Sequence, residues 1–154
     1  MSVVTARAEL TEGFAFRVAF GSGGSLMLDA SPPVGKGAGP RPMELVPAAL
    51  AGCTGMDVIG ILRKMRQDVT GYAVEVRAER AETHPQVLTA IEVEHVVSGR
   101  GLDPEAVRKA VELSATKYCS VGAMLREVVD LAESYTVVDE ATGARTHGTL
   151  AEAA

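Results

Sequence analysis

The sequence predicts an α+β fold, in which strands and helices occupy separate parts of the chain. Three strand-like segments precede one long apolar helix, two more strands follow it, and a helix pair and a last strand complete the order. Period-two alternation marks the strands, and an apolar spacing of three to four residues marks the helices. Segregation of this kind is typical of α+β domains. The chain of 154 residues suits one domain, which we expect to span residues 1–139.

The N-terminal region predicts three short strands followed by a loop. Alternating residues indicate strands at 3–10, 14–20 and 25–29, separated by glycine-containing turns. Residues 31–40 (SPPVGKGAGP) are rich in proline and glycine and show no periodicity. This segment is therefore expected to be a loop, and its place just before the long helix makes it a candidate wall or lid.

Residues 41–67 (RPMELVPAALAGCTGMDVIGILRKMRQ) predict the helix around which the other elements are arranged. The segment is almost wholly apolar up to Leu62, on both sides of the helix, so we expect a central core helix. Its length approaches the roughly 20 apolar residues that span a bilayer. Pro47, Asp57 and several small residues favour a soluble helix instead. We therefore expect no membrane partner and a cytoplasmic location.

The second half of the chain predicts two strands, two helices and a last strand, at residues 72–81, 87–98, 104–116, 121–130 and 134–139. The two strands are expected to pair as an antiparallel hairpin. Asp103 followed by Pro104 is a strong helix start, because aspartate caps a helix and proline fits its first position. Residues 140–154 are small, polar and alanine-rich, and are expected to form a loosely held tail.

Charge and composition narrow the classes of partner. The formal net charge is −5, whereas nucleic acids and anionic membranes favour basic surfaces. Three tyrosines, three phenylalanines and no tryptophan leave few side chains on which bases could stack. The three histidines lack ligand spacing, and we expect neither a metal site nor a cofactor.

The two cysteines, Cys53 and Cys119, are the candidate reactive groups. They lie too far apart in the sequence for a CxxC motif. One interpretation is two unrelated buried thiols. The other is a redox pair, because Cys53 lies among small residues and Cys119 lies at an expected helix start, where N–H groups lower the pKa of a thiol. Asp57, one turn after Cys53, would either hydrogen-bond near the thiol or form a helix-interface salt bridge.

Three motifs carry a resemblance to a known family. They are PMEL at residues 42–45, AALAGC at 48–53 and KYCSV at 117–121. Together they resemble the OsmC/Ohr family (osmotically inducible protein C and organic hydroperoxide resistance proteins), and within it the YhfA-like branch. The resemblance implies an OsmC-like fold, with antiparallel sheets wrapped around long central helices in an intertwined homodimer. It also places the active sites at the subunit interface.

The resemblance further implies a thiol-dependent peroxidase that reduces organic hydroperoxides and is regenerated by a dithiol. Cys53 matches the peroxidatic cysteine, and Cys119 matches the resolving cysteine. The family also uses a glutamate and an arginine to hold the thiolate, but Met43 occupies the glutamate position here. The candidates for that pair in this chain are Glu44, Arg41 and Arg17. The alternatives on the same scaffold are a non-catalytic dimer that binds an apolar ligand and a redox sensor.

Overall fold

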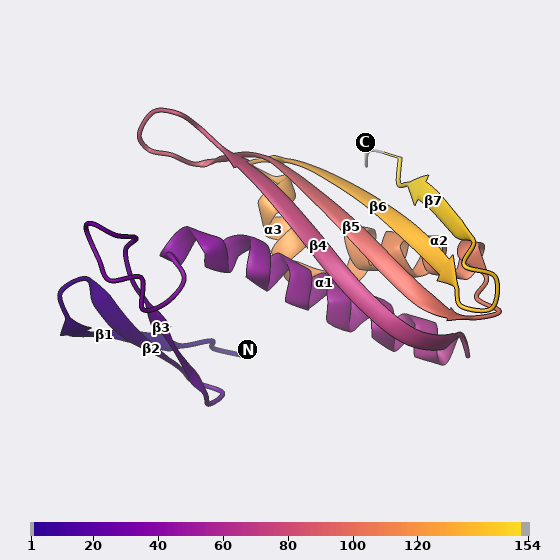
Figure 1. Ribbon diagram of the computed structural model, residues 1–154, viewed down its shortest axis with the longest axis horizontal. Coiled ribbons are helices and arrows are strands. Elements are labelled where there is room, and N and C mark those ends of the chain that lie inside the picture. Colours follow the sequence, from indigo (N-terminus) through magenta and orange to yellow (C-terminus); the bar gives the residue numbers. More distant parts are fainter. Residues whose placement is uncertain (1, 152–154) are drawn as a thin grey trace. The chain divides into compact units, whose positions relative to one another are not determined.

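The computed structural model describes residues 2–151 of the chain, shown as a ribbon in Figure 1. The chain divides into two compact units, Met1–Val46 and Pro47–Ala154, which are described in turn. Both contain the elements that the sequence predicts, in the predicted order. The α+β class is therefore confirmed.

The first unit is a three-stranded antiparallel sheet. Its strands are β1 (Ala6–Glu12), β2 (Ala15–Phe20) and β3 (Ser25–Leu28), paired in sequence order. The tight turn between β1 and β2 contains Gly13 at φ +52°, a left-handed conformation that glycine adopts without strain. Ala15 and Val18 are buried, whereas the three phenylalanines of this unit are exposed.

A single carboxylate organises the loop at residues 31–40. Asp29 accepts hydrogen bonds from the backbone N–H groups of Ala30, Lys36 and Ala38, at 2.8, 3.1 and 3.0 Å. The N–H of Ala38 is the largest of the causes that hold the pKa of Asp29 below its usual value, and burial opposes it. The proline- and glycine-rich loop is thus tied to the end of β3.

The long helix begins with a 3₁₀ turn, Pro42–Glu44 (η1), and continues as α1 (Leu45–Lys64). Its buried residues recur every fourth position, and they are Leu50, Thr54, Val58 and Leu62. Met56, on another side of α1, is 77% exposed among the described residues 2–151. By length and composition alone, Pro42–Lys64 is the one helix among residues 2–151 that could cross a membrane, which is weak support for a span.

The second unit contains a four-stranded sheet in the order β4-β5-β6-β7. Its strands are β4 (Asp68–Arg80), β5 (Leu88–Arg100), β6 (Asp130–Asp139) and β7 (Arg145–Thr149). The predicted β4–β5 hairpin is confirmed as antiparallel. The β5–β6 pair is parallel, because α2 (Pro104–Leu113), a π-helical turn (Ser114–Tyr118) and α3 (Ser120–Arg126) form the crossover between them.

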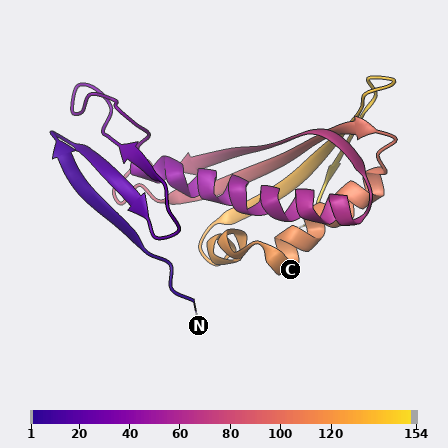
Figure 2. The same cartoon turned by 90° about the horizontal axis from the view of Figure 1, so that it is seen from below.

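Helices α1, α2 and α3 cover the same face of this sheet, as Figures 1 and 2 show from two directions. Alternation on β5 places Ile91, Val93, His95 and Val97 toward the helices, all at most 1% exposed. One apolar cluster joins the C-terminal half of α1 to α2 and the sheet, and a second surrounds the two cysteines. The core therefore lies between the sheet and the helices.

Two boundaries near the C-terminus differ from the sequence prediction. Strand β6 begins at Asp130 rather than at residue 134, because it pairs with β5 from Ala90 onward and α3 ends at Arg126. Within the expected tail, residues 145–149 form β7 instead, which pairs antiparallel with β6. The polar sequence of β7 suits an edge strand, for which period-two apolar alternation is not required.

Candidate functional site

The two thiols lie side by side although they come from distant parts of the sequence. Cys53 lies on the middle turns of α1, and Cys119 is the N-cap residue of α3. Their sulfur atoms and one carboxylate oxygen of Asp57 all lie within 4.8 Å of one another. Cys53 is partly exposed, and Cys119 is 4% exposed. Asp57 thus lies near the thiol, one of the two positions that the sequence left open.

A directional hydrogen-bond chain fixes the Asp57 carboxylate. Ser114 Oγ donates to Asp57 Oδ2 at 3.1 Å, and Thr54 Oγ1 lies 2.8 Å from Ser114 Oγ. A hydroxyl has one proton to donate. Because Ser114 gives its proton to Asp57, Thr54 must donate to Ser114. Thr54 and Ser114 are at most 1% exposed, so this chain links α1 to the π-helical turn through the core.

The π-helical turn brings Ser114 and Cys119 into this arrangement. Its wider bond runs from the N–H of Cys119 to the carbonyl of Ser114, at 2.9 Å. The backbone N–H of Gly122 then donates to the Cys119 sulfur at 3.3 Å. Single π-helical turns are frequent at functional sites. This turn places both a hydroxyl and a thiol toward α1.

The pKa of the Cys119 thiol moves in the direction opposite to the one that its N-cap position suggests. Burial is the first cause that raises this pKa to about 11, and Cys53 and the negative charge of Asp57 raise it further. The hydrogen bond from the Gly122 N–H lowers the pKa, but by less than burial raises it. The sequence argument correctly placed Cys119 at a helix start. It was wrong about the pKa, because the surrounding apolar cluster outweighs the helix terminus.

A second polar chain crosses the core of the same unit. The Tyr72 hydroxyl lies 2.7 Å from His95 Nδ1, and His95 Nε2 lies 3.4 Å from Glu133 Oε2. Glu133 in turn pairs with Arg126, which also donates to the carbonyl of Ala115 at 3.1 Å. Burial, followed by the charges of Glu133 and Asp57, raises the pKa of Tyr72. A buried carboxylate needs a charged partner, which Arg126 supplies to Glu133.

The weaker site candidates of the sequence lie in or next to the first unit. Glu44 accepts hydrogen bonds from the Arg41 backbone N–H at 2.7 Å and from Arg41 Nε at 3.3 Å, closing η1. These contacts, the backbone N–H first, lower the pKa of Glu44. Arg17 is exposed on β2, opposite Glu9 in the sheet register. A role for these residues beside the thiols stays a prediction.

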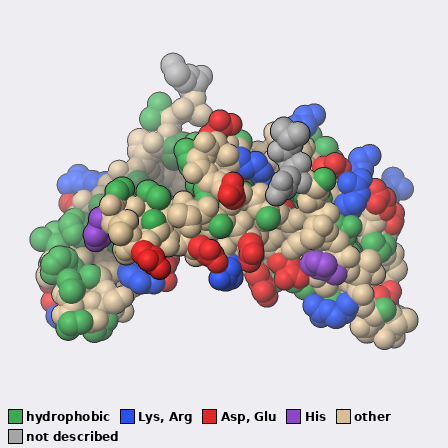
Figure 3. Space-filling model, turned by 90° about the horizontal axis from the view of Figure 1, so that it is seen from above, with side chains coloured by type: hydrophobic (Ala, Val, Ile, Leu, Met, Phe, Trp, Pro, Cys, Tyr) green, Lys and Arg blue, Asp and Glu red, His purple; other side chains and the backbone are tan. Residues whose placement is uncertain are grey.

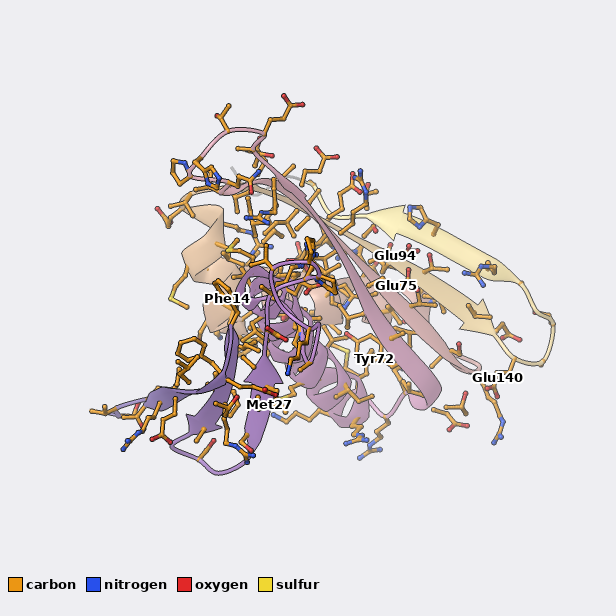
Figure 4. The ribbon with its side chains drawn as sticks, turned by 60° about the vertical axis from the view of Figure 1, so that its left-hand side comes forward. Phe14, Met27, Tyr72, Glu75, Glu94 and Glu140 are labelled. Atoms are coloured by element: carbon orange, nitrogen blue, oxygen red, sulfur yellow. The ribbon has the colours of Figure 1, made fainter. Side chains whose placement is uncertain are left out.

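The opposite face of the four-stranded sheet is polar. Glu75 and Glu94, labelled in Figure 4, are directly opposite each other on β4 and β5. With His147 they line a cavity of about 620 Å³ that contains neither thiol. The view in Figure 3 shows a row of acidic side chains with basic ones between them. This face differs in character from the apolar surroundings of the cysteines.

The sequence did not single out several residues of the site. Ser114, Thr54 and Glu133 gave no motif, because their partners are brought close only by folding. One signal was available for His95, which falls on the inward register of β5 between two valines. A histidine in that register requires a buried hydrogen-bond partner. Its neighbours Glu92 and Glu94 fall on the opposite register of the strand and face the other side of the sheet.

Comparison with known proteins agrees with the fold and the motifs. The family model described as OsmC-like protein matches residues 35–134. The chain is 41% identical to Protein YhfA of Escherichia coli K12 over 133 residues, covering 86% of this chain and 97% of that protein.

Solved structures extend the likeness. A hypothetical protein from Aquifex aeolicus VF5 has a TM-score of 0.80 at 31% identity, covering 91% of this chain and 99% of its own. The organic hydroperoxide resistance protein OhrB of Bacillus subtilis has a TM-score of 0.58 at 21% identity, covering 87% and 98%, and shows the shared fold. With the family model matching well over half of its length, the chain belongs to the OsmC-like family.

Proposed function

We propose that this protein reduces organic hydroperoxides, with Cys53 as the peroxidatic cysteine and Cys119 as the resolving cysteine. The observation that carries the proposal is the convergence of the two sulfur atoms within 4.8 Å. Membership of a family that includes organic hydroperoxide resistance proteins supports it. Cys53 is the more accessible thiol, and only an accessible thiolate can meet a substrate.

The chemistry balances with the two thiols and one hydroperoxide. The Cys53 thiolate attacks the distal oxygen, the O–O bond breaks, and the leaving alkoxide takes up a proton to become an alcohol. The resulting sulfenic acid is attacked by Cys119, which forms the disulfide and releases water. An external dithiol then reduces the disulfide by thiol exchange. One hydroperoxide and one dithiol thus give one alcohol, one water and one oxidised dithiol.

The surroundings of the pair support different roles for the two thiols. The raised pKa keeps Cys119 protonated at neutral pH, so that it does not compete for the peroxide before Cys53 has reacted. The partly buried hydrophobic residues packed in the same apolar cluster as Cys119 include Val121 and Leu125, which suit the carbon side of an organic hydroperoxide better than water.

We further propose that a second copy of the chain completes the molecule. Met56 on α1 is 77% exposed, and Met124 and Val128 beyond the thiol site are 66% and 79% exposed. An apolar helix face left uncovered in one chain requires a partner surface. Size-exclusion chromatography with light scattering should give twice the chain mass, and Met56→Glu should shift it toward the monomer. A monomeric wild-type protein would contradict this assembly.

The activity test follows cumene hydroperoxide in the presence of excess dithiothreitol. The wild-type protein should consume it over many turnovers. Treated with the hydroperoxide without dithiothreitol, it should show a Cys53–Cys119 disulfide by mass spectrometry. Cys53→Ser should lose consumption. Cys119→Ser, treated with the hydroperoxide without dithiothreitol, should instead retain a sulfenic acid on Cys53 that dimedone traps. Circular dichroism of each variant checks that it is folded.

Two results would contradict the peroxidase proposal. One is survival of both wild-type thiols in excess organic hydroperoxide. The other is consumption by Cys53→Ser at the wild-type rate. A single round of disulfide formation without sustained consumption would instead assign the pair to redox sensing. That alternative shares the 4.8 Å geometry but does not require regeneration.

A further inference from the structure

We propose that Cys53, Asp57 and Cys119 together bind one divalent metal ion of the zinc type when the thiols are reduced. The proposal is independent of peroxide turnover. It rests on three ligand groups, from three different turns of the chain, whose ligand atoms lie close together. No metal motif is visible in the sequence, because Cys53 and Asp57 lie on α1 whereas Cys119 lies at the start of α3, far along the chain.

The spacing of the ligand atoms fits a small tetrahedral ion. The two sulfur atoms and one Asp57 oxygen lie within 4.8 Å of one another. Zinc bound at about 2.3 Å to sulfur and about 2.1 Å to oxygen requires separations of roughly 3.6–3.8 Å. The difference is at most about 1.2 Å and is spread over three side chains. Small χ rotations therefore close the site without moving either helix.

The chemistry of the ligand set also selects this class of ion. Two thiolates and one carboxylate form a borderline-soft, negatively charged set, which zinc and cobalt(II) accept and magnesium and calcium do not. Binding would displace the thiol protons, since the metal takes the thiolate form. Three protein ligands leave one tetrahedral position open. The partly exposed Cys53 marks the side from which the ion can enter.

The residues around the three ligands resemble the supporting contacts of a built metal site. Ser114 Oγ donates to Asp57 Oδ2, which leaves the other carboxylate oxygen free to bind a metal. Thr54 fixes Ser114 in turn. The Gly122 N–H donates to the sulfur of Cys119. Hydrogen bonds of this kind orient the residues that bind a metal directly and tune the basicity of their ligand atoms.

The site also has a built-in dependence on oxidation. A disulfide between Cys53 and Cys119 removes both thiolate ligands at once. Diamide achieves this without a peroxide, because it accepts two electrons and two protons from the thiols and becomes a hydrazine. The oxidised protein should therefore lose its metal affinity whether or not the protein turns over hydroperoxides.

The test titrates reduced, chelator-treated, tag-free protein with cobalt(II). We expect one ion per chain, thiolate-to-cobalt charge-transfer bands and the visible bands of a tetrahedral ion, all displaced by zinc. Cys53→Ser and Cys119→Ser should lose the charge-transfer intensity of one thiolate each and bind at least about 100-fold more weakly. Ser114→Ala should weaken binding by about 10–100-fold through the lost carboxylate contact.

Matched controls keep the result interpretable. Asp57→Asn should weaken binding by at least about 10-fold. Asp130→Asn, which changes an exposed carboxylate at the start of β6, should leave it unchanged. In the wild-type protein, zinc should protect the partly exposed Cys53 from iodoacetamide, and EDTA should restore its alkylation. That readout needs no substitution and so does not depend on the folding of a variant.

Three results would overturn the metal site. They are no cobalt charge-transfer band in the reduced wild-type protein, wild-type affinity in Asp57→Asn, and undiminished binding after diamide. Failure of the metal site leaves the peroxide proposal untouched, because the cumene hydroperoxide assay is repeated with EDTA present and needs no metal ion. Conversely, a protein that binds zinc through both thiols but consumes no hydroperoxide supports the metal site and contradicts the peroxidase proposal alone.

Discussion

Ser114→Ala tests whether the hydrogen-bond chain from Thr54 to Asp57 holds α1 against the π-helical turn. The variant removes one hydroxyl that makes two buried contacts, 2.8 Å to Thr54 Oγ1 and 3.1 Å to Asp57 Oδ2. A hydrogen bond to a charged group is worth about 1.5–3 kcal/mol and a neutral one about 0.5–1.5 kcal/mol. The free energy of unfolding should therefore fall by about 2–4 kcal/mol.

Thr54→Val separates the two contacts. Because Ser114 still donates to Asp57 when Thr54 lacks its hydroxyl, this variant should lose only about 1 kcal/mol. In the Ser114→Ala background the Thr54 hydroxyl has already lost this partner, so its removal should cost little. The double variant should therefore be more stable than additivity requires, by about 0.5–1.5 kcal/mol.

Urea denaturation of reduced protein measures these quantities, at one fixed protein concentration because association with a second copy would add stability. Ser120→Ala is the matched control, since Ser120 is exposed at the start of α3 and its loss should change stability by less than about 0.5 kcal/mol. A Ser114→Ala effect as small as that of the control, or strict additivity with Thr54→Val, would refute the directional chain.

Three further outcomes follow from the core and the loop. Leu62→Ala should cost about 2–5 kcal/mol in urea denaturation, because Leu62 is 0% exposed, whereas Met56→Ala in a monomeric background should cost little. Glu133→Gln should cost about 3–5 kcal/mol, because it leaves the partly buried Arg126 without its charge partner; a loss below about 1 kcal/mol would contradict that pairing. Asp29 has a lowered pKa, so its stabilisation of the loop is present above its ordinary pKa and is lost as the pH falls through the lowered value. Hydrogen exchange of the loop amides should accelerate over that acidic range in the wild-type protein and be fast at neutral pH in Asp29→Asn; equal protection in both would count against the carboxylate.

The periodic parts of the chain were predictable because local chemistry dictates them. The three N-terminal strands, the long helix, the β4–β5 hairpin and the Asp103–Pro104 helix start all appear where alternation, apolar spacing and capping place them. The two cysteine motifs likewise indicated the family, which the comparisons confirm. These features depend on residues only a few positions apart.

The parts that were missed depend on residues far apart in the sequence. Strand β7 has no apolar alternation of its own and forms because β6 offers an unpaired edge. The partners of His95 are Tyr72 on β4 and Glu133 on β6, which lie on the two neighbouring strands. The parallel β5–β6 pairing follows from the crossover helices, and no single segment encodes it.

The sequence by itself determined that two cysteines lie in helical settings of opposite character, one among small residues and one at a helix start. Only the tertiary structure decided that their two sulfur atoms and a carboxylate oxygen of Asp57 lie within 4.8 Å of one another. It also decided that Cys119 has a raised pKa, although its local position favours a lowered one. The physical reason is that burial depends on what the whole chain packs around a thiol. That environment outweighs a nearby helix terminus and is invisible in the residues on either side of the cysteine.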